Sequence, residues 1–239
     1  ANRDLIRDGA KRYGSQCVVL SMDVKRVDGR FHIFAMGGRE DTGIEAVGWA
    51  RDGVARGAGE LVVNSMDTDG VKSGFDLPLL EAIAGAVDMP IFVYNVPGRT
   101  GVNVAAATMA RMFKEIPQVI GAKDATCDFI QISETMELCG PAFNLLSGDD
   151  FTLLPMCALG ARGVISVTSN LVPGKVAALF AAWKKGDIEE ARRIHYELNP
   201  LNRACFVETN PIPVKTALAK MGKMSGEMRL PMVPLQAKN

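Results

Sequence analysis

Short apolar runs alternate along this chain with longer segments of helical periodicity. A short run in which every residue is apolar is typical of a strand that is buried on both faces of a sheet. Because parallel strands need a crossover connection, usually a helix, the pattern predicts a parallel α/β fold with right-handed crossovers. The runs that fit parallel strands are residues 17–22, 61–66, 90–96, 119–123, 143–147 and 163–168.

The segments between these runs predict helices and one hairpin. Residues 30–36 alternate and follow Asp28-Gly29, which indicates a hairpin. Thr42 and Glu45 form a capping-box pattern that predicts a helix over 42–56. The other predicted helices are residues 2–13, 77–86, 104–114, 129–138, 150–159, 173–186, 187–198 and 214–221.

Polar side chains stand at the carboxyl ends of most predicted strands: Asp23, Asp67 or Asp69, Tyr94, Lys123, Asp149 and Thr168. A barrel builds its active site at that face, and no Gly-x-Gly-x-x-Gly follows a strand to indicate a dinucleotide site. We therefore predict one TIM-type (β/α) barrel domain over residues 1–239, with C-terminal helices appended. Six strands are fewer than the eight that the fold requires, so either two strands are missing, or another copy of the chain supplies them, or the barrel is unusual.

The composition of the chain indicates which classes of partner and which cell compartment to expect. Lys plus Arg number 27 and Asp plus Glu number 27, which gives no electrostatic reason to expect nucleic acid or an anionic membrane as partner. The longest apolar stretch, residues 153–172, is interrupted by glycines and Arg162, so we predict no membrane span. Five cysteines without a C-x-x-C pair predict reduced, mostly buried thiols in a cytoplasmic protein: Cys17, Cys127, Cys139, Cys157 and Cys205.

Lys123 is the candidate nucleophile. A lysine amine at the end of an apolar strand can attack a ketone and form an imine when it is neutral. Tyr94, at the end of the preceding strand, could relay protons, and Arg99 in the next loop could hold a carboxylate. By position alone, each has an ordinary alternative: a solvated lysine, a core tyrosine and a surface arginine.

Five ordered motifs strengthen the chemical interpretation: YNVPGRTG (94–101), GAKDAT (121–126), LLSGDD (145–150), GVISVT (163–168) and ETNPIPVK (208–215). Together they resemble dihydrodipicolinate synthase over residues 77–239. The resemblance implies that Lys123 forms an imine with pyruvate, that Tyr94 relays protons and that Arg99 binds the carboxylate of aspartate semialdehyde. It also implies that Gly148 and Ile165 line the pocket through their backbones.

Residues 1–76 carry a second resemblance. GSQCVVLSMDVKRVDG (14–29) and the segment 42–76 are similar to the cyclase subunit of imidazole glycerol phosphate synthase. That resemblance makes Asp23 a catalytic aspartate and Asp69 a substrate contact. The bland alternative is a pair of loop aspartates that cap nearby amides. We therefore interpret the chain as a chimera of two barrels, of the kind that engineering produces.

The leading hypothesis is a Schiff-base lyase of lysine biosynthesis that condenses pyruvate with an aldehyde. We expect impaired turnover, because the adjacent threonines of the family's proton relay, and a tyrosine borrowed from a neighbouring subunit, have no counterpart. The alternatives are a barrel scaffold without activity and residual cyclase chemistry. We expect a homo-oligomer and no cofactor. We also expect no metal, because His32 and His195 lie far apart and fit structural positions.

Overall fold

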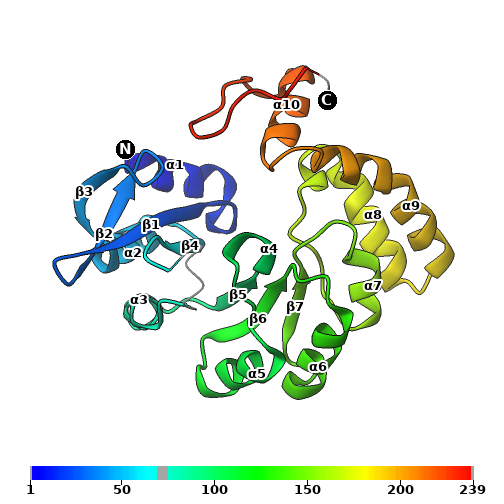
Figure 1. Ribbon diagram of the computed structural model, residues 1–239, viewed down its shortest axis with the longest axis horizontal. Coiled ribbons are helices and arrows are strands. Elements are labelled where there is room, and N and C mark those ends of the chain that lie inside the picture. Colours follow the sequence, from blue (N-terminus) through cyan, green and yellow to red (C-terminus); the bar gives the residue numbers. More distant parts are fainter. Residues whose placement is uncertain (1, 69–74, 238–239) are drawn as a thin grey trace. The chain divides into compact units, whose positions relative to one another are not determined.

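The computed structural model describes residues 2–68 and 75–237 (Figure 1). The chain divides into two compact units. The first unit comprises residues 1–91 and 98–102, and the second comprises residues 92–97 and 103–239. The prediction of a single barrel domain remains a prediction, and each unit is described by itself below.

The first unit is a four-stranded sheet in the order β3-β2-β1-β4 with helices beside it. β1 pairs with β2 in antiparallel register through the Asp28-Gly29 turn, where both residues have positive φ, so the predicted hairpin is confirmed. β1 and β4 are parallel, as a helical crossover requires. Its elements are α1 (Asp4–Tyr13), η1 (Ser15–Cys17), β1 (Val19–Val27), β2 (Arg30–Ala35), β3 (Glu40–Glu45), α2 (Ala46–Ala55), β4 (Glu60–Ser65) and α3 (Leu77–Ala84).

Two predictions for the first unit were wrong in their boundaries. The helix expected from residue 42 begins only at Ala46, because residues 40–45 pair with β2 as a third strand. Glu45 instead caps α2, and its carboxylate accepts the N–H groups of Val47 and Gly48 at 3.0 and 2.6 Å. Asp23 was expected to follow its strand, but it lies inside β1, which continues to Val27 to pair with β2.

The core of the first unit lies between β1 and two helices. Met22 and Val24 alternate on one face of β1 and are fully buried. They belong to one apolar cluster with Ala50 of α2 and with Leu79 of α3. Burial of this kind is worth about 1.5–3 kcal/mol for each large aliphatic side chain.

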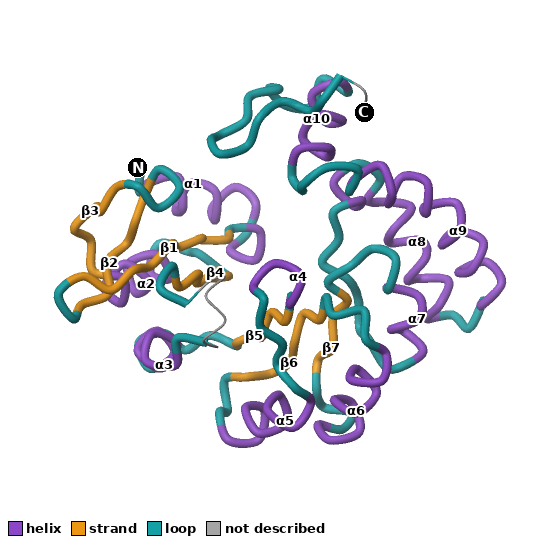
Figure 2. The backbone as a smooth tube through the Cα atoms, in the orientation of Figure 1, coloured by secondary structure: helices purple, strands orange, loops and turns teal. Residues whose placement is uncertain are grey.

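The second unit contains a three-stranded sheet in the order β5-β6-β7, with β6 and β7 parallel. α5 and α6 lie next to each other beside these strands, and α8 and α9 pack together (Figure 2). The elements from β5 onward are β5 (Ile91–Asn95), α4 (Pro97–Thr100), α5 (Ala106–Glu115), β6 (Val119–Asp124), α6 (Phe129–Cys139), β7 (Asn144–Ser147), α7 (Leu153–Ala158), η2 (Thr168–Asn170), α8 (Pro173–Lys184), α9 (Ile188–Cys205) and α10 (Ile212–Lys220).

The strand expected at residues 163–168 was also wrong. Only a single parallel bridge joins Val164 to Ser147, and the chain then turns into η2. The cause is Asp150, whose carboxylate accepts the N–H groups of Val167 and Thr168 that a ladder would need. Five of the six predicted barrel strands are therefore strands in the described part of the chain.

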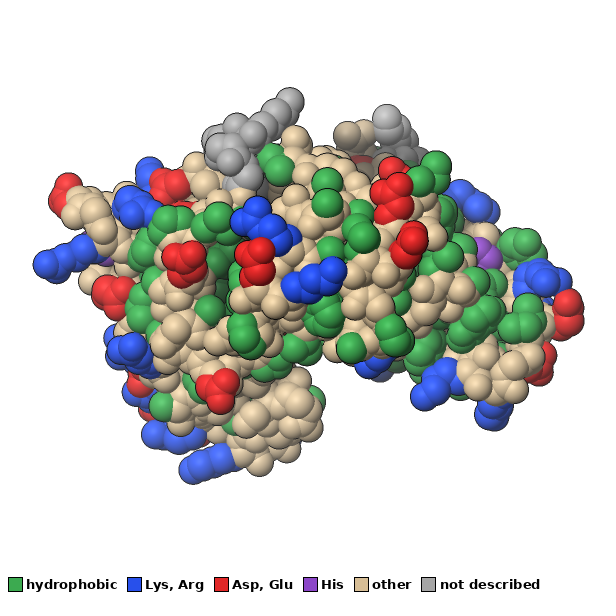
Figure 3. All heavy atoms as spheres, turned by 90° about the horizontal axis from the view of Figure 1, so that it is seen from below, with side chains coloured by type: hydrophobic (Ala, Val, Ile, Leu, Met, Phe, Trp, Pro, Cys, Tyr) green, Lys and Arg blue, Asp and Glu red, His purple; other side chains and the backbone are tan. Residues whose placement is uncertain are grey.

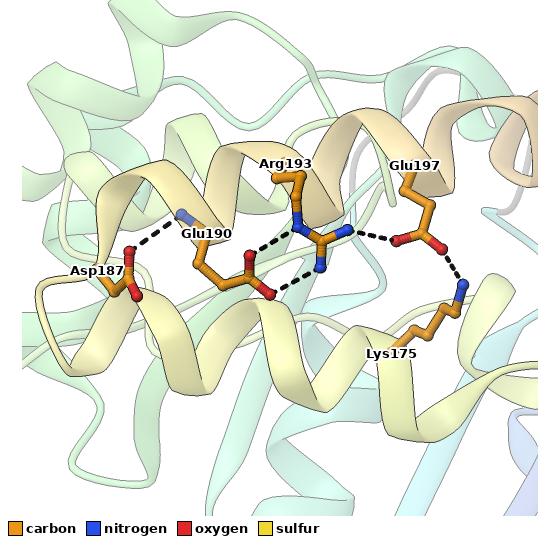
Figure 4. A network of polar contacts seen from close by, with 5 residues as sticks. All are labelled: Lys175, Asp187, Glu190, Arg193 and Glu197. Atoms are coloured by element: carbon orange, nitrogen blue, oxygen red, sulfur yellow. Dashed lines mark hydrogen bonds and ion pairs between the residues drawn. The ribbon is translucent and has the colours of Figure 1, made fainter.

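A surface network joins α8 to α9 (Figure 4). Arg193 forms hydrogen bonds with both carboxylate oxygens of Glu190 at 2.7 Å and with Glu197 at 3.2 Å. Glu197 also pairs with Lys175 of α8, and Asp187 caps α9 by accepting the N–H of Glu190. The Lys175–Glu197 pair joins α8 to α9, whereas the Arg193 pairs lie within α9. Exposed ion pairs of this kind contribute little to stability.

The surface carries both signs of charge. Acidic and basic side chains are interspersed with apolar ones on the face in Figure 3, in keeping with 27 residues of each sign. Among the helices of the described residues, none has both the length and the apolar character that crossing a membrane requires.

Candidate active site

Lys123 and Tyr94 lie together on neighbouring strands of the second unit. The Lys123 Nζ atom lies 3.8 Å from the centroid of the Tyr94 ring, well within the range of a cation–π contact. Tyr94 is 40% exposed and Lys123 is half-buried, so small molecules can reach both side chains. The sequence predicted this pairing of strand ends, and the structure brings the two residues into contact.

Strand alternation explains why these two side chains share a face. On β5, Val93 and Asn95 are buried while Tyr94, between them, is exposed. On β6, Ala122 and Asp124 are buried while Lys123, between them, remains accessible. Lys123 pairs with Leu146 of β7 and therefore points to the same face of the sheet as that residue.

Two glycines let the strands approach closely around Lys123. Gly121 lies directly against the backbone of Asn144 on β7, where any Cβ would collide. Gly148 donates its N–H to the carbonyl of Asp124 at 2.7 Å, and a Cβ on it would lie 2.8 Å from the Cβ of Ala125. Gly148, a predicted pocket residue, thus has its backbone held against the residues that follow Lys123.

Asp124, next to Lys123, is a buried carboxylate on the opposite face. It accepts hydrogen bonds from the N–H and the hydroxyl of Thr126 at 2.9 and 2.6 Å. Burial raises the pKa of Asp124, the Thr126 hydrogen bonds oppose that rise, and the nearby charge of Asp128 adds to it. The side chain therefore shapes the turn after β6.

Ile165, another predicted pocket residue, comes after α7 in the chain and lies beside the end of β7. Its N–H donates to the carbonyl of Ser147 at 2.9 Å, and its side chain is 47% exposed. Asp150 fixes the residues that follow: its buried carboxylate accepts hydrogen bonds from the Ser166 hydroxyl and from the N–H groups of Val167 and Thr168. Gly148 and Ile165 are therefore attached to the ends of β6 and β7 through backbone hydrogen bonds.

The remaining predicted site residues belong to the first unit. Arg99 is exposed on α4, and its role stays a prediction. Asp23 on β1 accepts a hydrogen bond from Asn64 of β4 at 3.2 Å, a satisfied contact between adjacent strands. Asp69 lies outside the described residues.

A comparison with family models matches residues 14–239 to the Dihydrodipicolinate synthetase family. The chain belongs to this family. Membership makes the protein a class I aldolase-type lyase, as the motifs around Lys123 and Tyr94 predicted.

Relatives of the synthetase family align over nearly all of the chain. The 4-hydroxy-tetrahydrodipicolinate synthase of Nitratidesulfovibrio vulgaris is 49% identical over 223 residues, which cover 92% of this chain and 75% of that protein. The enzyme of the same description from Thermodesulfovibrio yellowstonii is 45% identical over 228 residues, which cover 95% and 77%.

Solved structures agree. The crystal structure of dihydrodipicolinate synthase from Aquifex aeolicus matches with a TM-score of 0.79 and 33% identity, over 99% of this chain and 75% of that one. The Thermotoga maritima enzyme matches with the same TM-score and identity, over 99% and 76%. The predicted fold class, a TIM-type (β/α) barrel with C-terminal helices, is confirmed.

The family match also bears on the first part of the chain. It includes residues 14–76, the segment whose motifs resemble the cyclase. The comparisons therefore give no support for a chimera with that cyclase, and synthase relatives account for nearly the whole length.

Titratable groups elsewhere fit structural roles. His32 pairs with Asp41 at 3.0 Å, and the pKa of Asp41 is lowered first by the Gly43 N–H and then by His32. Burial lowers the pKa of His195. Within residues 2–68 and 75–237, no three His, Cys, Asp or Glu side chains gather as metal ligands would.

The cysteines correct one expectation. All five are free thiols, but only Cys157 and Cys205 are buried, whereas Cys17 and Cys127 are exposed and Cys139 is intermediate. Burial raises the pKa of Cys157 to about 11, so this thiol stays protonated and unreactive at neutral pH.

Proposed function

We propose that this synthetase-family protein condenses pyruvate, held as an imine on Lys123, with aspartate semialdehyde. The contact between Lys123 and Tyr94 carries the proposal, because it places an amine and a phenol together at an accessible strand end. The activity named for the relatives, 4-hydroxy-tetrahydrodipicolinate synthase, supplies the substrates.

The proposed chemistry needs an amine nucleophile and a group that exchanges protons. The neutral amine of Lys123 adds to the ketone carbon of pyruvate, and water leaves as the carbon–nitrogen double bond forms. Loss of a methyl proton gives an enamine, whose terminal carbon forms a bond with the aldehyde carbon of the second substrate. The amino group of that substrate then displaces Lys123 and closes the ring. Tyr94 exchanges the protons of these steps.

The other proposed residues bind rather than react. The backbones of Gly148 and Ile165 would line the pyruvate pocket beside Lys123, because both are held at the ends of β6 and β7. Arg99 would hold the carboxylate of the aldehyde substrate, since a guanidinium forms paired hydrogen bonds with a carboxylate. Asp23 and Asp69 have no part in this proposal.

Borohydride trapping tests the imine directly. Incubation with pyruvate and sodium borohydride should fix a reduced adduct on the peptide that contains Lys123, as read by mass spectrometry. The variant Lys123→Ala should lose the adduct, while Lys114→Ala, which removes a lysine from α5, should keep it. A wild-type protein without an adduct at Lys123 would refute the proposal. Cooperative unfolding without an adduct would favour the inactive scaffold instead.

We also propose that the protein is a homo-oligomer in a reducing compartment. Phe129, Ile130 and Leu138 of α6 are exposed, and Ile130 is 75% exposed. Phe129 and Ile130 line a surface hollow with Leu159, next to α7. A second copy of the chain is the proposed occupant, since an apolar patch of this kind favours protein contact. Sedimentation equilibrium should show a mass above that of the monomer, and Ile130→Glu should lower it. A monomeric wild type would contradict this.

A further inference from the structure

Asn95 is a fully buried amide at the end of β5. It is 1% exposed, and its side chain points away from the face that carries Tyr94, because successive strand residues point to opposite sides. A buried amide must satisfy its two N–H donors and its carbonyl, or each unpaired group costs about 1–3 kcal/mol. The partners that Asn95 uses are therefore informative.

Asn95 pairs with both backbone groups of Val104. Its Nδ2 donates to the carbonyl of Val104 at 3.1 Å, and its Oδ1 accepts the N–H of Val104 at 3.1 Å. The side chain thus acts as a strand partner would, and it closes the base of the loop formed by residues 96–103. That loop carries Arg99.

The side-chain amides of Asn103 and Gln131 connect the pairing of Asn95 with Val104, called the clamp below, to α6. Asn103 Oδ1 accepts hydrogen bonds from Asn95 at 3.0 Å and from Gln131 at 3.2 Å, and its Nδ2 donates to Gln131 at 2.6 Å. Gln131 also donates to the carbonyl of Val104 at 3.1 Å. The returning end of the loop is therefore fastened to both β5 and α6.

The backbone of Asn95 contacts the turn that follows Lys123. Its carbonyl accepts the N–H of Ala125 at 2.9 Å, two residues after Lys123. One residue thus joins the strand end beside Tyr94, the base of the Arg99 loop and the turn that follows Lys123.

We propose that Asn95 is a positioning residue whose side-chain amide clamps the base of loop 96–103 and so holds Arg99 for the carboxylate of the aldehyde substrate. The proposal rests on the function proposed above. Asn95 itself touches no substrate. A loosened loop should weaken capture of the aldehyde but leave imine formation with pyruvate intact, since Lys123 lies on a different strand.

The test compares Asn95→Ala with Asn144→Ala. Asn144 carries a matched amide on β7 that donates to the carbonyl of Ile120 at 3.0 Å and pairs with Arg162, away from the loop. We expect both variants to trap pyruvate on Lys123. In Asn95→Ala the KM for aspartate semialdehyde should rise about tenfold or more, the range for losing a charged hydrogen bond, with a smaller change in kcat. Asn144→Ala should keep the wild-type KM.

A second readout does not depend on activity. Trypsin cleaves after arginine, so Asn95→Ala should be cut after Arg99 faster than the wild type, and Asn144→Ala should not. Folded Asn95→Ala with wild-type cleavage and KM would overturn the clamp. Faster cleavage with an unchanged KM would overturn the positioning role. If the wild type traps no pyruvate, the proposed function fails while the cleavage comparison still tests the clamp.

Asn103→Ala covers the case in which Asn95→Ala does not fold. It removes the links of Asn103 to Asn95 and Gln131 but keeps the pairing of Asn95 with Val104. We expect smaller changes in the same direction, in both cleavage after Arg99 and the KM for the aldehyde. Wild-type behaviour in a folded Asn103→Ala would then count against the clamp.

Discussion

The amine of Lys123 lies over the face of the Tyr94 ring, with Nζ 3.8 Å from the ring centroid. Two parts of the tyrosine can therefore contribute to the reaction at Lys123. The ring shields and orients the amine, whereas the hydroxyl can exchange protons. A substitution that removes only one of them distinguishes the two.

Tyr94→Phe keeps the ring and removes the hydroxyl. We expect turnover to fall about 10²–10⁴-fold, the usual loss when a proton-transfer group is removed. The free energy of unfolding should stay close to that of the wild type, because Tyr94 is 40% exposed and the ring is retained. Steady-state kinetics with both substrates and urea unfolding check the two expectations. Unchanged turnover in Tyr94→Phe would remove Tyr94 from the proton relay.

Much of the fold could be predicted from apolar runs. Residues 119–123 and 143–147 form paired strands, as their apolar runs predict, and the motifs around Lys123 and Tyr94 identified the family. The failures came from long-range contacts. Residues 163–168 look like a strand locally, but Asp150, far back in the sequence, takes their N–H groups. The capping-box pattern at residue 42 indicates a helix start, but residues 40–45 pair with β2 as the strand β3.

The sequence also hid two supporting residues of the site. Asn95 lies in the same motif as Tyr94 and Arg99, and its role becomes visible only in its hydrogen bond to the carbonyl of Val104. In the sequence, Asp150 resembles an ordinary acidic loop residue, and its role follows only from the three donors that its carboxylate accepts. The available signal was a polar residue at the buried position of an alternating strand, which Asn95 provides next to Tyr94. Motif order could identify the lysine, whereas the hydrogen bonds that hold its surroundings required coordinates.

Gly148→Ala tests the close approach of β6 and β7. The new Cβ would lie 2.8 Å from the Cβ of Ala125 and 2.9 Å from the carbonyl of Asp124, both tied to the strand end. We expect a loss of about 1–3 kcal/mol in the free energy of unfolding, the usual cost of overpacking. Gly174→Ala is the control, since a Cβ there meets nothing within 4 Å, in the first turn of α8. Urea midpoints should separate the two, and equal midpoints would contradict the close approach.

Asp124 gives a prediction about pH. Burial raises its pKa in the folded protein, so between the ordinary value of 3.8 and the raised value the folded state binds more protons than the unfolded state. Stability from this group is therefore present at low pH and is lost as pH rises through the raised pKa. Asp124→Asn keeps an oxygen for Thr126 and cannot ionise. Its stability relative to wild type should rise across that interval, and a constant difference between the two would contradict the prediction.

Asp150→Ala tests the attachment of the segment that carries Ile165. The change leaves the N–H groups of Val167 and Thr168 without their acceptor, and we expect a loss of at least about 1–3 kcal/mol in the free energy of unfolding. Asp150→Asn should lose less, because one amide oxygen can still accept both N–H groups. If Ile165 lines the pyruvate pocket, the KM for pyruvate should rise in Asp150→Ala.

Asp187→Ala provides the matched control for this last prediction. Asp187 also accepts a backbone N–H, that of Glu190, but it caps α9 and does not touch the segment that carries Ile165. Its removal should cost about 0.5–2 kcal/mol of stability without changing the KM for pyruvate. The comparison therefore separates a general loss of stability from a displaced pocket. Equal KM values in the two alanine variants would show that Asp150 stabilises the fold without positioning Ile165 for pyruvate.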